Sequence, residues 1–307
     1  MLPPPERRCM VSAMTTASKP YGRVAAILVG LVGALAFLPS LPGRFVWDDE
    51  VLIRGNDRIR NPESLSELIS TPFWSISSDL GEIAWAYQRM HRPFVKLAYH
   101  LEFRLFGDAP FGFHVVNVLL HVACALLVFD AARARIPDRQ GSSSLAAAVA
   151  ATLFAVHPTR VEAVAWISGS TDLWMTFFVL VAEKVFRDAR SPARFVVGAA
   201  SLAFAGFSKE PALLVPALIA FDAVRGGEPK DVVSKRFGAA LAASAVVGAA
   251  WFLVARSVPV STGPAMETTM GRLVPRVLAS LGGYVELVLH PGPGTIYPGL
   301  VVRHANG

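Results

Sequence analysis

The sequence has little charge and almost no cysteine. Asp, Glu, Lys and Arg make up only 17% of the 307 residues, whereas a soluble globular domain carries about 25%. Two cysteines, Cys9 and Cys124, exclude a disulfide framework, and we expect both to be free thiols. Long Pro/Gly-rich tracts and internal repeats of solenoid length are also missing. These absences argue against a second soluble domain and against a repeat protein.

Apolar segments dominate what remains, and the mean hydropathy is +0.46. They lie at residues 24–42, 111–132, 144–157, 173–186, 195–207, 211–224, 237–255 and 273–290. Because roughly 20 apolar residues cross a bilayer as a helix, we predict an all-α polytopic integral membrane bundle of about eight transmembrane or re-entrant segments. The segments 144–157, 195–207 and 211–224 are short, so they are either tilted helices or, for the last two, a re-entrant hairpin.

The distribution of Lys and Arg predicts the orientation of the bundle. Basic residues gather in the tail 1–23 and in alternate short loops, which places these parts in the cytoplasm. We therefore expect a cytoplasmic tail 1–23, an uncleaved first span, and a membrane domain 24–307 in the inner (plasma) membrane. Since the basic residues lie between apolar segments and form no single patch, we expect no nucleic-acid partner.

The longest loop, 43–110, then lies on the outer side, and it contains two amphipathic patterns. One places Leu65, Leu68 and Ile69 on a single helical face. The other, 94–106, places Phe94, Leu97, Leu101 and Leu105 on one face and Lys96, His100 and Arg104 on another. Such helices either lie along the membrane surface or pack onto the core of the protein.

Two adjacent carboxylates, Asp48 and Asp49, follow the first apolar segment directly. Neighbouring carboxylates repel each other, so one holds a proton more readily or the pair attracts a cation. Both properties suit an enzyme that works on a lipid-borne substrate. The alternative is a solvated loop that merely ends the first span.

Further polar residues fall at the same predicted boundary, where charged and titratable groups are costly and mark functional sites. They are His91, Arg92, His114, Asn117, His121, His157, Glu162, Asp172, Lys209 and Glu210.

Simpler structural roles compete with catalysis for several of these residues. His114, Asn117 and His121 share one helical face, which favours interhelical hydrogen bonds over catalysis, and their spacing is not that of a zinc site. Asp172 is suited to capping the helix that follows it. Glu162 needs a partner, for which Arg92, Arg160 and Lys209 are candidates, and Lys209 is expected to pair with its neighbour Glu210.

Five motifs together resemble a known family. WDDE (47–50), HRPF (91–94), GFHVVNVLLH (112–121), HPTRVEAVAWISGSTDL (157–173) and FSKEPAL (207–213) occur in this order. The set resembles the membrane region of the transmembrane and tetratricopeptide-repeat O-mannosyltransferases and their bacterial relatives, which belong to the GT-C superfamily of glycosyltransferases. The likeness covers about 45–215 and, weakly, 284–294. Tetratricopeptide repeats are missing, Phe94 stands where relatives often carry leucine, and the superfamily usually has more spans, so we expect a C-terminally incomplete domain or a partner subunit.

The resemblance implies a GT-C-like enzyme that moves a mannose-like sugar from a polyprenyl-phosphate donor to a hydroxyl of a protein or glycan on the outer face. Asp48 or Asp49 would be the catalytic base, and Arg92 with Lys209 would hold the leaving phosphate. His157, Glu162, Asp172 and Glu210 would line the substrate pocket. It implies no metal or other cofactor by default, although superfamily members differ in metal use. A non-catalytic scaffold that binds a glycolipid or a partner subunit is the alternative, and a transporter is less favoured because no duplicated hydropathy pattern is present.

Overall fold

A computed structural model describes residues 22–74, 90–137, 142–187, 191–219 and 230–257, and within these ranges the chain is helical with no strand. An unlabelled helix at 22–37 comes first. It is followed by η1 (Leu38–Ser40), η2 (Glu50–Arg54), α2 (Asp57–Arg60), α3 (Leu65–Ser70), α5 (Pro93–Phe106), α6 (Pro110–Arg135), α7 (Ser142–Val156), α8 (Arg160–Ala165), η4 (Ile167–Gly169), α9 (Ser170–Arg187), α10 (Pro192–Ser208), η5 (Glu210–Leu214) and α12 (Lys230–Ser257).

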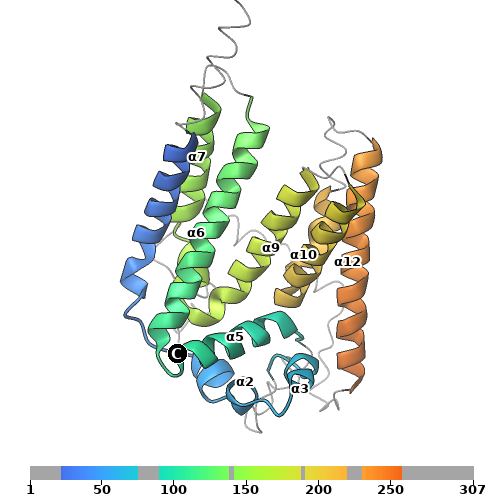
Figure 1. The fold of residues 1–307 in the computed structure, drawn as a ribbon. Helices are drawn as coiled ribbons and strands as arrows, with labels where there is room; N and C mark the ends of the chain where they lie inside the picture. Colours follow the sequence, from blue (N-terminus) through green and yellow to red (C-terminus); the bar gives the residue numbers. More distant parts are fainter. Residues whose placement is uncertain (1–21, 75–89, 138–141, 188–190, 220–229, 258–307) are drawn as a thin grey trace, which may run out of the picture.

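The long helices stand side by side, and α5 lies across one end of them (Figure 1). Helix α6 packs against both α7 and α9, and α10 packs against both α9 and α12. The short helices α2 and α3 pack on α5 at the same end, which we call the α5 end. This arrangement gathers residues 43–74 and 90–110 into a cap over one end of the bundle.

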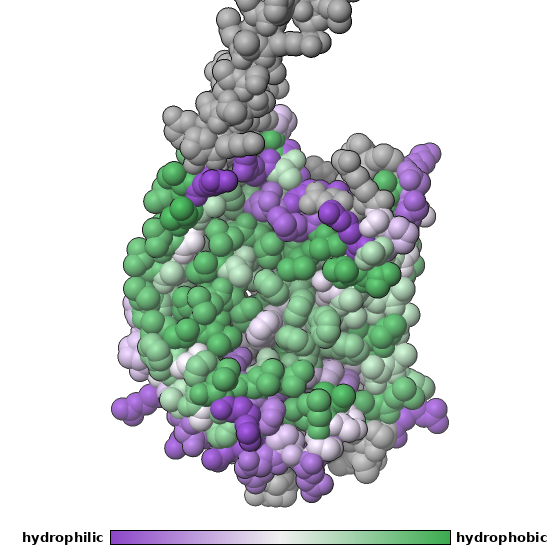
Figure 2. Space-filling view, viewed as in Figure 1, coloured by the Kyte–Doolittle hydropathy of each residue, from purple (hydrophilic) through white to green (hydrophobic). Residues whose placement is uncertain are grey.

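The bundle has the surface of a membrane protein. Three helices, Gly22–Ser40, Pro110–Arg135 and Lys230–Val254, are long and apolar enough to cross a bilayer, and α7, α10 and Glu210–Ile219 are shorter apolar helices. Figure 2 shows a broad apolar band between two polar ends. The prediction of an all-α membrane bundle is therefore confirmed for the described residues, while the segment 273–290 lies outside them.

The chain reverses direction at Lys209. Pro211 in the first turn of η5 cannot continue α10, because proline lacks an N–H group and clashes with the preceding turn. The residues that follow run back along the bundle, since Val215 and Ile219 pack against a core cluster that includes Phe186. Lys209 therefore lies at the tip between two antiparallel helices, a feature that both alternatives for this region share.

Helix α5 packs onto the protein with a face that does not include Leu101 and Leu105. Val95, Tyr99 and Glu102 are buried, whereas Leu101 and Leu105 are exposed. Lys96, predicted on the polar face, is only 1% exposed because its ammonium group donates to the Thr71 hydroxyl and to the Thr71 carbonyl at 3.0 Å. Of the two alternatives for this helix, packing of the Leu101 and Leu105 face onto the core is contradicted. The alternative in which that face lies along the membrane surface stays a prediction.

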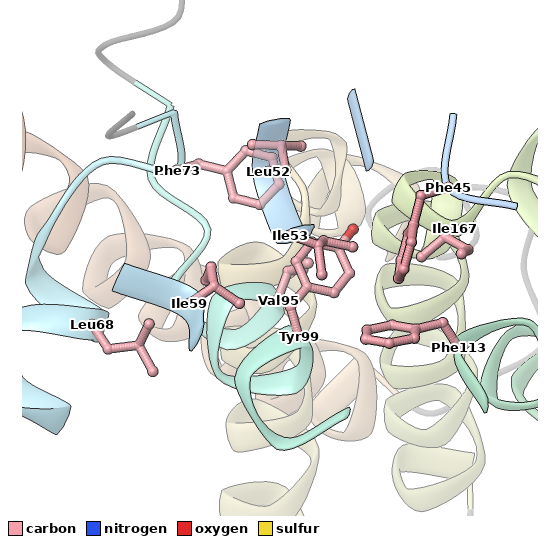
Figure 3. Packing of buried hydrophobic residues seen from close by; sticks show 10 residues of the cluster. All are labelled: Phe45, Leu52, Ile53, Ile59, Leu68, Phe73, Val95, Tyr99, Phe113 and Ile167. Carbon is pink, nitrogen blue, oxygen red and sulfur yellow. The ribbon is translucent and has the colours of Figure 1, made fainter. Parts of the chain in front are cut away.

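The 43–74 segment shares a hydrophobic core with the helices beneath it. Figure 3 shows side chains from this segment, α5, the start of α6 and η4 pointing toward one another. The cluster consists of Phe45, Leu52, Ile53, Ile59, Leu68, Phe73, Val95, Tyr99, Phe113 and Ile167. In α3 only Leu68 points into it, while Leu65 and Ile69 are exposed. This cluster fixes the cap to the bundle through apolar burial.

Glu102 gives this part of the fold a testable pH dependence. Its carboxyl group is buried without a hydrogen-bond partner among the described residues, and burial raises its pKa from 4.5 to about 8. A raised folded-state pKa contributes stability that is present below pH 4.5 and is lost as the pH rises through about 8. We expect Glu102→Gln, which stays neutral, to have an increasingly higher unfolding temperature in detergent than the parent over that range. The exposed Glu63→Gln is the control, and pH profiles of parent and Glu102→Gln that run parallel would contradict the assignment.

Candidate active site

The turn that carries the two aspartates is closed at both ends by hydrogen bonds. Asp49 N donates to Val46 O at 3.0 Å, and Val46 N donates back to Asp49 Oδ2 at 3.0 Å. The second bond is the reciprocal half of a capping box, in which an acid three residues into a helix accepts from the residue that starts it. Trp47 and Asp48 therefore occupy the two central positions of a locked four-residue turn.

The other oxygen of Asp49 holds a distant part of the chain. Asp49 Oδ1 accepts from Ser168 N at 2.8 Å and from Ser168 Oγ at 2.5 Å, across 119 residues. The side chain is 0% exposed. Burial raises the pKa of Asp49, and the hydrogen bonds from Ser168 and Val46 oppose that shift. Both carboxylate oxygens are thus engaged in structure.

The turn around Ser168 is itself held by two other helices. Asn117 Nδ2 of α6 lies 3.1 Å from the Trp166 carbonyl and within 3.4 Å of two further carbonyls in the same turn. Tyr99 of α5 donates to Ser168 O at 3.3 Å and accepts from Ser170 Oγ at 3.2 Å. A Cβ on Gly169 would overlap the backbone of Glu162, so this close approach requires glycine.

Asp48 differs from Asp49 in being accessible. Its side chain is partly exposed, and no hydrogen bond to its carboxylate is found within the described ranges. Partial burial raises the pKa of Asp48 above its ordinary value. The structure therefore separates the two neighbours into a buried anchor and an accessible carboxylate.

Two ion pairs form a second cluster at the α5 end. Arg92 binds Glu210 through two parallel contacts, Nε to Oε1 at 3.0 Å and Nη2 to Oε2 at 2.7 Å. Lys209 Nζ lies 2.6 Å from Asp172 Oδ2. The expected local pair between Lys209 and Glu210 was wrong, because the reversal of the chain between α10 and η5 directs the two side chains to different helices.

Two aromatic rings, those of Phe73 and Tyr99, connect this cluster to the Asp49 network. The Arg92 guanidinium lies over the Phe73 ring at 5.2 Å, and the Phe73 ring is 6.4 Å from that of Tyr99. Tyr99 in turn reaches Ser168, the partner of Asp49. The aspartate turn and the ion pairs are therefore parts of one neighbourhood.

The α8 region places three predicted residues differently. Glu162 is exposed and forms no ion pair with Arg92, Arg160 or Lys209 in the described structure, so the expected partner is not found. Burial and Asp172 raise the pKa of Glu162, and Lys209 opposes the shift. His157 Nδ1 lies 2.9 Å from the Thr159 hydroxyl.

The sequence predicts Arg160 only as a possible partner for Glu162, whereas in the structure it adds a positive charge that is not paired with Glu162. It stacks on Phe154 at 5.2 Å and donates to the Thr159 hydroxyl. Within the described residues, no carboxylate contacts it.

Asp172 lies in the first turn of α9, where its negative charge suits the helix dipole in addition to its pairing with Lys209.

The polar stripe of α6 faces the interior of the bundle. His114, Asn117 and His121 are all buried. His121 Nε2 lies 2.9 Å from the Ala155 carbonyl at the end of α7, so it joins two helices as Asn117 does. His114 packs against Gly43, where a Cβ would come within 2.6 Å of the imidazole. His91 is buried near Lys96, and burial lowers its pKa to about 4.

Sequence reasoning missed Ser168, Tyr99 and Trp47. Ser168 lies in a Ser-Gly-Ser turn that signals a tight backbone, but nothing in the sequence connects it to Asp49. Tyr99 resembled an ordinary core residue of an amphipathic helix. Trp47 directly precedes the two aspartates in the sequence, so its place beside them could have been used to predict it as a site residue.

Comparison with known proteins finds similar sequences for about half of the chain. It is 36% identical over 167 residues to protein O-mannosyl-transferase Tmtc1 of Drosophila melanogaster, covering 52% of this chain and 18% of that protein. It is 32% identical over 180 residues to protein O-mannosyl-transferase TMTC4 of Homo sapiens, covering 54% and 24%. The corresponding values for protein O-mannosyl-transferase F38B6.6 of Caenorhabditis elegans are 34% over 158 residues, 51% and 22%.

No family model and no solved structure matches the chain. The matched region spans about a quarter or less of each of these curated relatives. Over about half of its own length, the chain is similar to the TMTC protein O-mannosyl-transferases, and this confirms the resemblance that its motifs indicated.

Proposed function

We propose that the protein is a membrane glycosyltransferase that moves a mannose-like sugar from a polyprenyl-phosphate donor to a hydroxyl of a protein or glycan. The names of its relatives support the reaction class. The observation that carries the proposal is that the two adjacent aspartates have different roles in the structure. Both carboxylate oxygens of Asp49 accept structural hydrogen bonds, whereas the carboxylate of Asp48 is accessible on the same closed turn.

In this proposal Asp48 is the general base. It removes the proton of the acceptor hydroxyl as the oxygen attacks the anomeric carbon, the bond from that carbon to the phosphate oxygen breaks, and the configuration inverts. The proton ends on Asp48, and the polyprenyl phosphate leaves with its negative charge. A partly desolvated carboxylate with a raised pKa is a stronger base than a fully solvated one.

The departing phosphate needs positive charge, and three cations are available. Arg92 and Lys209 are held by Glu210 and Asp172, so phosphate would have to replace a carboxylate at each. Arg160 carries no such competitor in the described part of the chain and would meet the phosphate without this exchange. His157 and Glu162 would line the pocket for the sugar and the acceptor.

The proposed orientation of the site is supported by basic residues at the opposite end of the bundle. Arg135 at the end of α6, and Lys184 and Arg187 at the end of α9, lie at the end away from α5. With the positive-inside rule, this distribution supports a cytoplasmic N-terminus and an α5 end on the periplasmic or extracellular side of the plasma membrane.

The two aspartates provide a matched pair of variants. Asp48→Asn is expected to lower sugar transfer by about 10²–10⁴-fold, because it removes the base, with an unfolding temperature close to that of the parent. Asp49→Asn is expected to lower the free energy of unfolding by about 1–3 kcal/mol, because an amide cannot accept from both Val46 and Ser168.

The measurement is transfer of radiolabelled mannose from polyprenyl-phosphate mannose in membrane vesicles, with detergent melts for stability. Full transfer by Asp48→Asn would rule out the assignment of the base. Donor binding without transfer by the parent protein would favour the non-catalytic scaffold instead.

The Arg92–Glu210 pair gives a second test. If phosphate competes with Glu210 for Arg92, Glu210→Gln should lower the KM for the donor roughly two- to fivefold, as expected for loss of one partly exposed competing ion pair. Arg92→Gln should raise that KM. Asp108→Asn, which breaks the exposed pair with Arg60, is the control and should leave the KM unchanged. A higher KM in Glu210→Gln would contradict the competition.

A further inference from the structure

Trp47 has a backbone conformation that tryptophan rarely adopts. Its φ is 49°, and it is the only non-glycine residue with positive φ in the described ranges. The left-handed region costs an L-residue roughly 1–2 kcal/mol, and glycine, asparagine or aspartate normally occupies it. The position therefore carries strain that a glycine would remove.

Packing of the ring does not explain this strain. The side chain is 58% exposed, so most of its apolar surface is not buried in the protein. The turn is closed by Asp49, whose hydrogen bonds to Val46 and Ser168 impose the conformation. Strain that the surrounding structure maintains, without a packing gain, is typical of functional positions.

The ring is nevertheless held in one orientation. The Trp47 and Trp166 rings meet edge to face, with centroids 6.2 Å apart and an interplanar angle of 81°. Trp166 immediately precedes the η4 turn, and its carbonyl is held by Asn117. Asn117, which helps to hold the turn around Ser168, thus also holds the residue that the exposed Trp47 ring contacts.

We infer that Trp47 is a positioning residue on which the pyranose ring of the donor sugar stacks. This inference rests on the proposed function and adds a contact for the sugar itself. The C–H face of a hexopyranose is apolar and fits the negative face of an indole. As the bond to phosphate lengthens, the sugar gains positive charge, which an aromatic face also stabilises.

Stacking of the sugar on Trp47 would matter for catalysis because Asp48, the proposed base, is the next residue in the sequence. Asp48 follows Trp47 within the same locked turn, so a sugar on the indole lies beside the carboxylate that activates the acceptor. Stacking would thus set the distance between the anomeric carbon and the base. The alternative role for an exposed tryptophan is an anchor in the headgroup layer of the membrane, which carries no preference for a sugar.

A binding experiment separates these roles without depending on turnover. In the Asp48→Asn background, binding of radiolabelled polyprenyl-phosphate mannose is compared with binding of polyprenyl phosphate that lacks the sugar. Trp47→Gly suits the backbone and removes the ring, whereas Trp47→Phe keeps a smaller ring. We expect Trp47→Gly to weaken binding of the sugar-bearing lipid about tenfold and leave the sugar-free lipid unchanged, with Trp47→Phe between it and the parent.

The outcomes distinguish this inference from the function it rests on. Tight binding of the sugar-bearing lipid by Trp47→Gly, equal to that of its parent, would overturn the stacking role while leaving the proposed donor intact. Equal losses for both lipids would assign Trp47 to the membrane interface and would also overturn it. Failure of the parent to bind either lipid would overturn both proposals. Detergent melts control for folding, and Trp47→Gly is expected to unfold at or above the temperature of the parent.

Discussion

The bond between Asp49 and Ser168 is the constraint on which the rest of the α5 end depends. It joins the turn after the first span to the turn before α9, two parts of the chain that share no secondary structure. A buried carboxylate is costly unless its oxygens are satisfied, and here both are. Because Tyr99 and Asn117 hold the same turn, these hydrogen bonds connect α5 and α6 to the loop that carries Asp49.

Local pattern was enough to predict much of this molecule. The apolar segments within the described residues became helices, since a chain in lipid must satisfy its backbone internally. The reversal at Lys209 followed from a proline after a polar break. The inward direction of the α6 stripe followed from three polar residues on one face of an apolar helix.

The partners of individual side chains could not be predicted from the local sequence pattern. Arg92 finds Glu210 across 118 residues, and Lys209 prefers Asp172 to its own neighbour. The burial of Lys96 could not be predicted for the same reason, because it depends on loop oxygens of Thr71 that meet its ammonium group. Such choices depend on how helices meet in space, whereas spacing along one helix reports only which residues share a side.

The Arg92–Glu210 and Lys209–Asp172 pairs neutralise the charges of this arginine and this lysine at rest. A small soluble anion such as free phosphate gains little there, because it must first separate Arg92 from Glu210 or Lys209 from Asp172. A phosphate on a long hydrocarbon chain is already concentrated at the site by partitioning into the surrounding bilayer. Under the proposed function, the paired Arg92 and Lys209 would thus favour a phosphate delivered through the lipid phase over a small soluble anion.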